Sequence, residues 1–216
     1  MKELIVKKIE SNHHKPDDFT YYSKMVDATS VYKINRVNWT MYPYTPEVYF
    51  KIAYNDDFLF LKYWVKENYL MAKVTQDNGP VCTDSCVEFF ISPDENGYYN
   101  FEFNAIGTCL SAYGKSRQER EKAGDHILRK IIRISSSGDQ PFEERTGNME
   151  WNLFIAIPAV GFFCHNIRKF KSMDMQGNFY KCGDNLSQPH YLTWSTINTV
   201  TPDFHCPAFF GNIRLR

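Results

Sequence analysis

Short runs in which apolar and polar residues alternate fill most of the chain from residue 48 onward. Successive side chains of a β-strand point to opposite faces, so this alternation predicts half-buried strands. We expect strands at 48–54, 58–65, 69–74, 86–92, 98–106, 127–134, 150–157, 179–182, 191–194 and 209–215, and a helical turn at 158–164. Many short strands with little helix predict an all-β fold, an antiparallel β-sandwich of the jelly-roll or immunoglobulin-like type with short helical insertions.

The chain divides into regions of different character without any sign of a linker. Its 216 residues contain no repeat and no Gly/Ser/Pro-rich stretch, so we expect one domain over residues 1–216. Residues 1–45 are polar with scattered aromatics, and we expect an irregular segment packed on the sandwich. Residues 114–126 are strongly charged and predict a solvated loop or a short helix.

The predicted strands 86–92 and 98–106 flank Pro-Asp-Glu-Asn-Gly, a sequence that supplies the turn chemistry of a hairpin. Pairing the two arms symmetrically about this loop places Phe89 opposite Phe101 on an apolar face. The same register places Glu88 opposite Glu102 on the other face, with Asn104 one pair further along. A slip of one residue would turn the carboxylates into the core, so the pattern favours this register.

Two carboxylates that face each other across a strand pair repel unless something compensates them. A basic side chain from a neighbouring strand, a bound cation, a shared proton or a ligand that donates hydroxyl hydrogens would each do so. Carboxylates flanked by aromatic rings suit a sugar, whose hydroxyl edge needs acceptors and whose C–H face needs a ring. The alternative interpretation is a solvated outer face on which Glu88 and Glu102 point into water.

Four segments, in this order, resemble the family 9 carbohydrate-binding modules: DSCVEFFIS at 84–92, YNFEFN at 99–104, YLTWS at 191–195 and FFGNIRL at 209–215. That family consists of antiparallel β-sandwiches attached to xylanases and related polysaccharide-degrading enzymes. The resemblance runs from about Val48 to the C-terminus and implies non-catalytic binding of a saccharide end.

The resemblance also implies which side chains contact the sugar. It places an acidic ligand residue at Glu88, and it places Glu102 and Asn104 where the family has an arginine and an asparagine. A polar ligand position falls on Lys181, which we expect to compensate the charge of Glu102.

The aromatic clamp of the family is only half present. One of its two stacking tryptophans falls on Phe204, whereas the other falls near Cys82. The further side chains that we expect at the site are Tyr180, Asp184, His205 and, as a ligand contact or a core residue, Trp194.

Composition narrows the range of partners. Aromatic residues make up 16% of the chain, and its 25 basic and 25 acidic residues form no long run of either sign. The chain therefore lacks the basic stripe of a nucleic-acid binder and the polybasic patch of a membrane binder. We expect a mono- or oligosaccharide as ligand, with no nucleic acid and no membrane. The first residues lack the apolar segment of a signal peptide, so we expect a cytoplasmic rather than a secreted protein.

No cofactor or metal ligand is assigned from the sequence. The six cysteines form no Cys-x-x-Cys pair, which favours reduced thiols and argues against a structural zinc site. Modules of family 9 can hold structural calcium, and four aspartates lie in predicted turns, at 56, 57, 77 and 94, without the spacing of a calcium loop.

Two other functions stay open at this point. Facing carboxyl groups could act as the acid and nucleophile of a glycoside hydrolase, with Glu88 and Glu102 as the pair. A degenerate module could instead serve as a protein-interaction domain.

Overall fold

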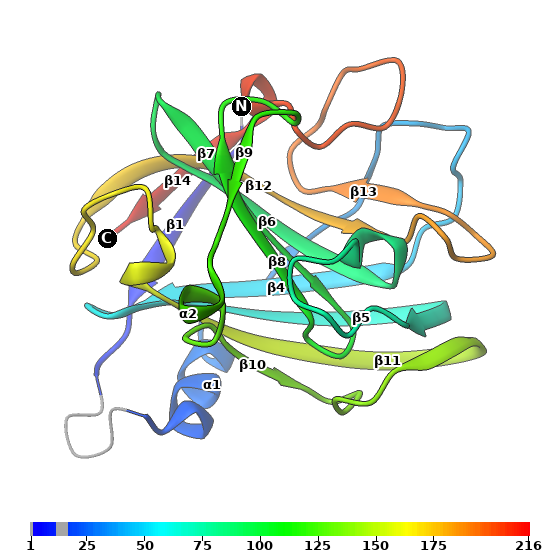
Figure 1. The fold of residues 1–216 in the computed structure, drawn as a ribbon, viewed down its shortest axis with the longest axis horizontal. Coiled ribbons are helices and arrows are strands. Elements are labelled where there is room, and N and C mark those ends of the chain that lie inside the picture. The colour runs from blue at the N-terminus through cyan, green and yellow to red at the C-terminus, as the bar shows by residue number, and fades with distance from the viewer. Residues whose placement is uncertain (1, 12–16) are drawn as a thin grey trace.

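The computed structural model describes residues 2–11 and 17–216, which form two β-sheets packed face to face (Figure 1). Sheet B contains, in spatial order, β10 (Ile132–Ser135), β11 (Phe142–Pro158), β5 (Phe58–Ala72) and β4 (Glu47–Tyr54), with β2 (Tyr32–Lys33) beside β4. Sheet A contains β14 (Gly211–Leu215), β12 (Met173–Cys182), β6 (Cys86–Asp94), β7 (Gly97–Asn104), β8 (Cys109–Gly114) and β9 (Arg120–Lys122). The short strands β13 (Tyr191–Thr193) and β3 (Arg36–Val37) extend sheet A from β12. The predicted antiparallel β-sandwich is confirmed.

Aromatic and branched residues from both sheets fill the space between them. Phe50 of β4 stacks on Phe179 of β12 with ring centroids 3.9 Å apart, and Phe89 of β6 stacks on the same ring at 4.8 Å. Val87 and Phe101 are fully buried on this face, as the alternation predicts. Each such side chain contributes about 1.5–3 kcal/mol through burial, so this layer stabilises the fold.

The N-terminal segment is not irregular, contrary to our prediction. Strand β1 (Glu3–Lys8) runs parallel to β14 at its start and parallel to β4 at its end, so it joins the two sheets. Helix α1 (Phe19–Asp27) begins after Asp18, whose carboxylate accepts a hydrogen bond from the Tyr21 backbone N–H at 3.0 Å. It buries Tyr22 and Val26 on the outer face of sheet B (Figure 1). Both elements depend on docking against distant strands, which local patterns do not reveal.

Other boundaries differ from the prediction in smaller ways. The expected strands at 58–65 and 69–74 form one long strand, β5, and residues 125–128 form a short helix, α2 (Asp125–Leu128), before β10. Strand β9 was not predicted, because it lies in the charged segment 114–126. Strand β8 was not predicted either, although its sequence contains no charged residue. Gly107 has a φ of +85°, which favours glycine and turns the chain from β7 into β8. The helical turn expected at 158–164 corresponds to the 3₁₀ turn η2 (Ala159–Gly161).

Loops cover the outer face of sheet A and create a second apolar layer there. The segment 194–210, which contains the 3₁₀ turn η3 (Pro207–Phe209), packs beside the 38–46 loop (Figure 1). Trp39 Nε1 donates to the Thr199 carbonyl at 2.9 Å, and the Asn178 side-chain oxygen accepts from the Ser195 backbone N–H at 2.8 Å. These bonds hold the loops over β6, β7 and β12, where the site lies. Among the described helices, none is long and apolar enough to cross a membrane.

Candidate functional site

A pocket of about 270 Å³ opens between the outer face of sheet A and its covering loops. Its floor comes from β6, β7 and β12. Its walls come from the loops after β3, β8, β12 and β13, from the start of β13 and from η1 (Val81–Thr83). Acidic and aromatic side chains dominate this lining, and the predicted residues Glu88, Glu102, Asp184, Phe204 and His205 all contribute to it.

The two glutamates occupy the predicted register. Glu88 lies opposite Glu102, and Phe89 lies opposite Phe101. Glu88 is 3% exposed and Glu102 is 6% exposed. The interpretation of a solvated outer face is therefore wrong, because loops from elsewhere in the chain exclude most of the water from this face.

Each glutamate accepts a hydrogen bond from an uncharged donor. Cys182 Sγ donates to Glu88 Oε1 at 3.1 Å, and Asn100 Nδ2 donates to Glu102 Oε1 at 2.8 Å. Arg120 Nε in turn donates to Asn100 Oδ1 at 2.9 Å.

Both carboxyl groups hold their protons more tightly than exposed glutamates do. Burial raises the pKa of Glu88 well above its usual range, and the neighbouring Glu102 carboxyl raises it further. Burial likewise raises the pKa of Glu102, while the Asn100 hydrogen bond and the Arg120 charge oppose this rise. The pair therefore retains protons at pH values at which an exposed glutamate is ionised.

Asp184 supplies a third carboxyl group to the pocket. Its Oδ1 atom is buried and has no hydrogen-bond partner among the described residues. Burial raises the pKa of Asp184. Within the part of the chain that the structure describes, no lysine, arginine or histidine forms an ion pair with Glu88, Glu102 or Asp184.

Two basic side chains line the pocket without contacting these three acids. The Arg117 side chain is 61% exposed, and its Nη1 atom lies 3.9 Å from Asp203 at the rim. His205 Nδ1 lies 2.9 Å from the Tyr98 hydroxyl. Burial, together with the charges of Arg120 and Arg117, lowers the pKa of His205 to about 4, so its imidazole is neutral at neutral pH.

Aromatic rings form one wall of the pocket. Phe204 stacks on Tyr180 with centroids 4.1 Å apart and an angle of 4° between the ring planes. The Tyr180 hydroxyl donates to the Phe204 carbonyl at 3.1 Å. Tyr180 is fully buried behind Phe204 and does not line the pocket, so it supports the predicted stacking ring from behind. Tyr42 and Tyr191 complete the wall with an edge-to-face contact at 4.8 Å.

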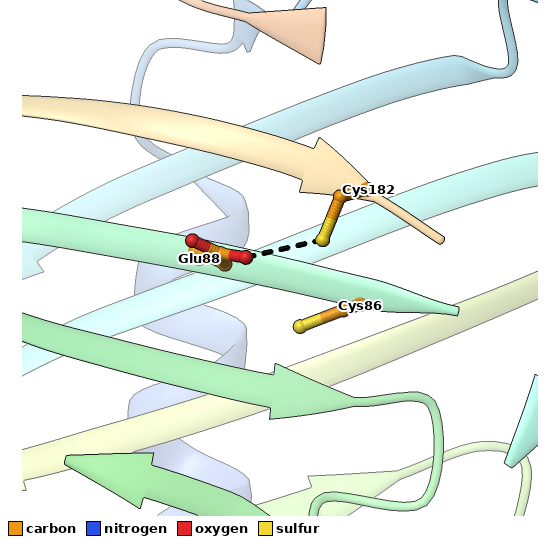
Figure 2. A group of neighbouring side chains, drawn as sticks. All are labelled: Cys86, Glu88 and Cys182. Carbon is orange, nitrogen blue, oxygen red and sulfur yellow. Dashed lines mark hydrogen bonds between the residues drawn. The ribbon is translucent and has the colours of Figure 1, made fainter. Parts of the chain in front are cut away.

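A group of thiols lies beside Glu88 at the inner end of the pocket (Figure 2). The sulfur atoms of Cys86 and Cys182 and a carboxylate oxygen of Glu88 all lie within 4.8 Å of one another. Burial raises the pKa of Cys86 to about 12 and that of Cys182 well above its usual range. A soft metal ion could be held here only after both thiols lose their protons, which burial opposes, so the thiols act as hydrogen-bond donors and packing groups.

Lys181 is not at the pocket, and the prediction that it compensates Glu102 is wrong. It pairs with Val87, so its side chain points to the core side of sheet A, whereas Tyr180 pairs with Glu88 on the pocket side. Lys181 Nζ lies 2.9 Å from Glu67 Oε2 and 2.8 Å from His190 Nε2. Adjacent strand residues point to opposite faces, so Tyr180 and Lys181 cannot share one face.

Asn104 also has a structural task away from the pocket lining. Its Nδ2 atom donates to the Val74 carbonyl at 2.8 Å and to Asp84 Oδ2 at 2.9 Å. Its Oδ1 atom accepts from the Thr108 backbone N–H at 2.9 Å. The expected role in ligand binding is not supported, because these bonds use the amide to tie β7 to the loops around it.

Trp194 is a core residue, the second of the two roles expected for it. It is 3% exposed and meets the Phe179 ring edge-to-face with centroids 5.6 Å apart. It does not line the pocket.

Several lining residues were missed by the sequence analysis as site residues. Arg117 reaches the pocket from the charged loop before β9, and Tyr42 reaches it from the N-terminal loop. Cys182 was detectable, because an antiparallel pairing that places Tyr180 beside Glu88 also places Cys182 beside Cys86 on the same face. Cys82, the position at which a stacking tryptophan was expected, does line the pocket.

The turn aspartates considered for calcium mostly pair with basic side chains. Asp56 pairs with Lys8, Asp77 lies 2.6 Å from Arg133 Nη1, and Asp94 Oδ2 lies 3.3 Å from His165 Nε2. All six cysteines are free, in agreement with the expectation of reduced thiols.

Comparison with known proteins gives one family and one fold. The family model described as carbohydrate-binding family 9 matches residues 22–215. The structure of a candidate carbohydrate-binding protein from Bacteroides uniformis is 41% identical, with a TM-score of 0.94, and the match covers 100% of this chain and 99% of that one.

More distant structures share the fold. A family 9 carbohydrate-binding module from Caldicellulosiruptor kristjanssonii in complex with glucose is 14% identical, with a TM-score of 0.54, and the match covers 100% of this chain and 96% of that one. A structure of such a module from the same organism in complex with cellotriose is 14% identical, with a TM-score of 0.53 and coverage of 100% and 94%. A search of curated proteins returned no match.

Proposed function

Because the chain belongs to carbohydrate-binding family 9, we propose that it binds a mono- or oligosaccharide by one end in the pocket of sheet A and does not cleave it. The observation that carries this proposal is the combination of polar and aromatic groups in one pocket. The buried carboxyl groups of Glu88 and Glu102 form its floor, and the rings of Phe204, Tyr42 and Tyr191 form its wall.

The chemistry of the pocket suits the two sides of a sugar ring. Carboxyl oxygens accept hydrogen bonds from hydroxyl groups, and Glu88 and Glu102 present such oxygens side by side. An aromatic ring packs against the C–H face of a sugar. Tyr180 holds Phe204 in place for that contact by stacking on its rear side.

The size of the pocket supports binding at a chain end. Pockets for small molecules usually measure about 300–1,000 Å³. This pocket, at about 270 Å³, suits one terminal sugar unit, with any further units extending past the rim.

The protonation of the acidic pair favours binding over hydrolysis. A glycoside hydrolase of the retaining type needs one protonated carboxyl and one ionised carboxyl that acts as nucleophile. Burial raises the pKa of both Glu88 and Glu102, and the two side chains lie on one face of one sheet. This arrangement suits hydrogen bonding to hydroxyl groups on one side of a ligand.

A glycan array followed by calorimetry with glucose and cellotriose tests the proposal. We expect saccharide binding that weakens in Phe204→Ala by about 1–3 kcal/mol, by analogy with the range found for nucleic-acid bases stacked on aromatic side chains. Phe204→Leu, which keeps most of the volume and loses the ring, separates stacking from folding. Phe142→Ala on β11 of sheet B serves as the matched control and should bind normally.

Two outcomes would contradict the proposal. Absence of binding to any saccharide by the folded protein would remove it and would favour a protein-interaction domain. Turnover of aryl glycosides that disappears in Glu88→Gln would show a hydrolase instead.

A further inference from the structure

The pocket contains far more acidic than basic groups. Four carboxyl side chains line it, those of Glu88, Glu102, Asp184 and Asp203. Arg117 is the one lysine or arginine among the described residues that line it, and its ion-pair partner is Asp203 at the rim, 3.9 Å away. The three inner carboxyl groups therefore have no ion-pair partner among the described residues.

A buried cation, the Lys181 ammonium group, lies on the neighbouring strand but does not pair with the pocket acids. Lys181 points to the opposite face of sheet A and pairs with Glu67. The imidazole of His205 is neutral at neutral pH, because burial lowers its pKa to about 4. Among the described residues that line the pocket interior, no basic side chain thus carries a positive charge beside the acids, and the Arg120 guanidinium reaches Glu102 only through Asn100.

Burial keeps protons on Glu88 and Glu102, and a neutral sugar does not change this, because it supplies no charge that would favour their ionised form. Ionised carboxylates that are buried without a cation are costly, and two of them facing each other also repel. Hydroxyl groups donate hydrogen bonds to them but bring no charge. An ammonium group brings a full positive charge and three N–H donors, so it can serve several carboxylates at once.

We propose that the pocket selects saccharides that carry an ammonium group, that is, amino sugars, over neutral sugars of the same ring geometry. The inference rests on the proposed function, since it names the class of saccharide that the same site takes. Directly opposite residues of an antiparallel pair have β-carbons about 4.5–5.5 Å apart. Glu88 and Glu102 can therefore both reach one nitrogen between them at the usual charge-assisted distance of about 2.7–2.9 Å.

Asp184 adds a third carboxyl group to the pocket lining. Its buried Oδ1 atom has no hydrogen-bond partner among the described residues, so this group adds to the acidic charge that an ammonium group would meet. The burial that raises the pKa of all three acids shows that each would gain from a nearby positive charge.

Calorimetry with three monosaccharides tests this inference directly. We expect glucosamine to bind roughly tenfold or more tightly than glucose at neutral pH, with a chelator present, because a charge-assisted pair adds at least about that factor. N-acetylglucosamine has the same ring but no charge, so it should lose this advantage. If the monosaccharides bind weakly, the β-1,4-linked disaccharides of the same three sugars replace them in the comparison.

Isosteric variants locate the effect. Glu102→Gln and Glu88→Gln should each lower the ratio of glucosamine affinity to glucose affinity by about tenfold, because each removes one carboxylate that faces the ammonium group. Glu150→Gln removes the same charge from an exposed position on β11 of sheet B and should leave the ratio unchanged. Thermal unfolding of each variant confirms that the compared proteins are folded.

The outcomes separate the inference from the function on which it rests. If glucose and glucosamine bind equally, or if the ratio survives in both glutamine variants, the inference is overturned and saccharide binding stands. If added calcium or zinc raises the affinity for glucose and removes the advantage of the amine, the cation is a metal ion and the inference is again overturned. If no saccharide binds, the proposed function itself fails.

Discussion

Buried acids lie against both faces of sheet A, a single glutamate from sheet B on the core side and a pair of glutamates on the pocket side, and only the first has a cation as its partner. On the core side, Glu67 of β5 has Lys181 Nζ at 2.9 Å and accepts a hydrogen bond from Trp151 Nε1 at 2.6 Å. On the pocket side, Glu88 and Glu102 accept bonds only from a thiol and an amide among the described residues.

The neighbours of the core-side pair also engage the Lys181 ammonium group, which donates to the Cys182 carbonyl at 2.9 Å. His190 Nδ1 lies 3.0 Å from the Gln188 carbonyl, which can only accept, so this nitrogen carries the proton. His190 Nε2 then accepts from Lys181 at 2.8 Å. Burial lowers the pKa of His190 well below its usual range, which agrees with a neutral ring. Lys181 is therefore fully engaged by protein groups and is not available to a ligand.

Burial alone does not distinguish an acid that stabilises the fold from an acid that binds a ligand. Both regions exclude water, and both contain carboxyl groups. The distinguishing feature is whether a cation lies beside the acid. A buried acid that already has its cation is part of the framework. A buried acid pair that has no cation and faces a pocket is available to a ligand. Three predictions test this distinction.

The largest effect is expected from breaking the compensated pair. Lys181→Met leaves Glu67 buried without its cation and should lower the free energy of unfolding by about 3–5 kcal/mol. Denaturation with urea measures this change. Glu88→Gln, which replaces one carboxyl group of the uncompensated pair by a neutral amide, should leave the free energy of unfolding unchanged or raise it. A larger loss in Glu88→Gln than in Lys181→Met would contradict the comparison.

A smaller loss is expected at Asn104, which lies on the pocket face but is used for structure. Asn104→Ala leaves the Val74 carbonyl and the Thr108 N–H without their partner and should cost about 1–3 kcal/mol of unfolding free energy. Saccharide affinity of the folded variant should be unchanged, as calorimetry below its unfolding temperature can show. A selective loss of affinity with normal stability would place Asn104 at the ligand after all.

The smallest effect per step is the dependence of stability on pH, because it is spread over several pH units. The folded-state pKa values of Glu88 and Glu102 are raised above the unfolded value of 4.5, so the folded protein binds more protons than the unfolded chain in this window. Stability is therefore full below pH 4.5 as far as this pair is concerned, and it falls as the pH rises through the folded-state pKa values.

The slope of this change is at most about 1.4 kcal/mol per pH unit for each proton. Urea denaturation of the wild-type protein and of the double variant Glu88→Gln/Glu102→Gln at several pH values checks it. The double variant should show a flatter profile above pH 4.5. Parallel profiles would show that the two carboxyl groups ionise normally.

The alternation of residues along the chain was sufficient to predict the sandwich and the central hairpin. Each strand has a period of two, so the positions of Phe89 and Phe101 fix which face is buried and hence that Glu88 faces Glu102. The same rule, applied at β12, places Tyr180 and Lys181 on opposite faces, so only one of the two can lie on the side of Glu88.

Tertiary structure decided everything that depends on segments far apart in the chain. Strand β1 and helix α1 are stable because they dock on distant strands. The pocket exists because the loop at 194–210 and Tyr42 cover the outer face of sheet A, which the local sequence pattern alone does not show to be covered. That cover buries Glu88 and Glu102 and raises their pKa values. Local patterning thus determined which way each side chain points, whereas long-range packing decided what it meets there, since the cost of a buried charge depends on neighbours that the local sequence does not contain.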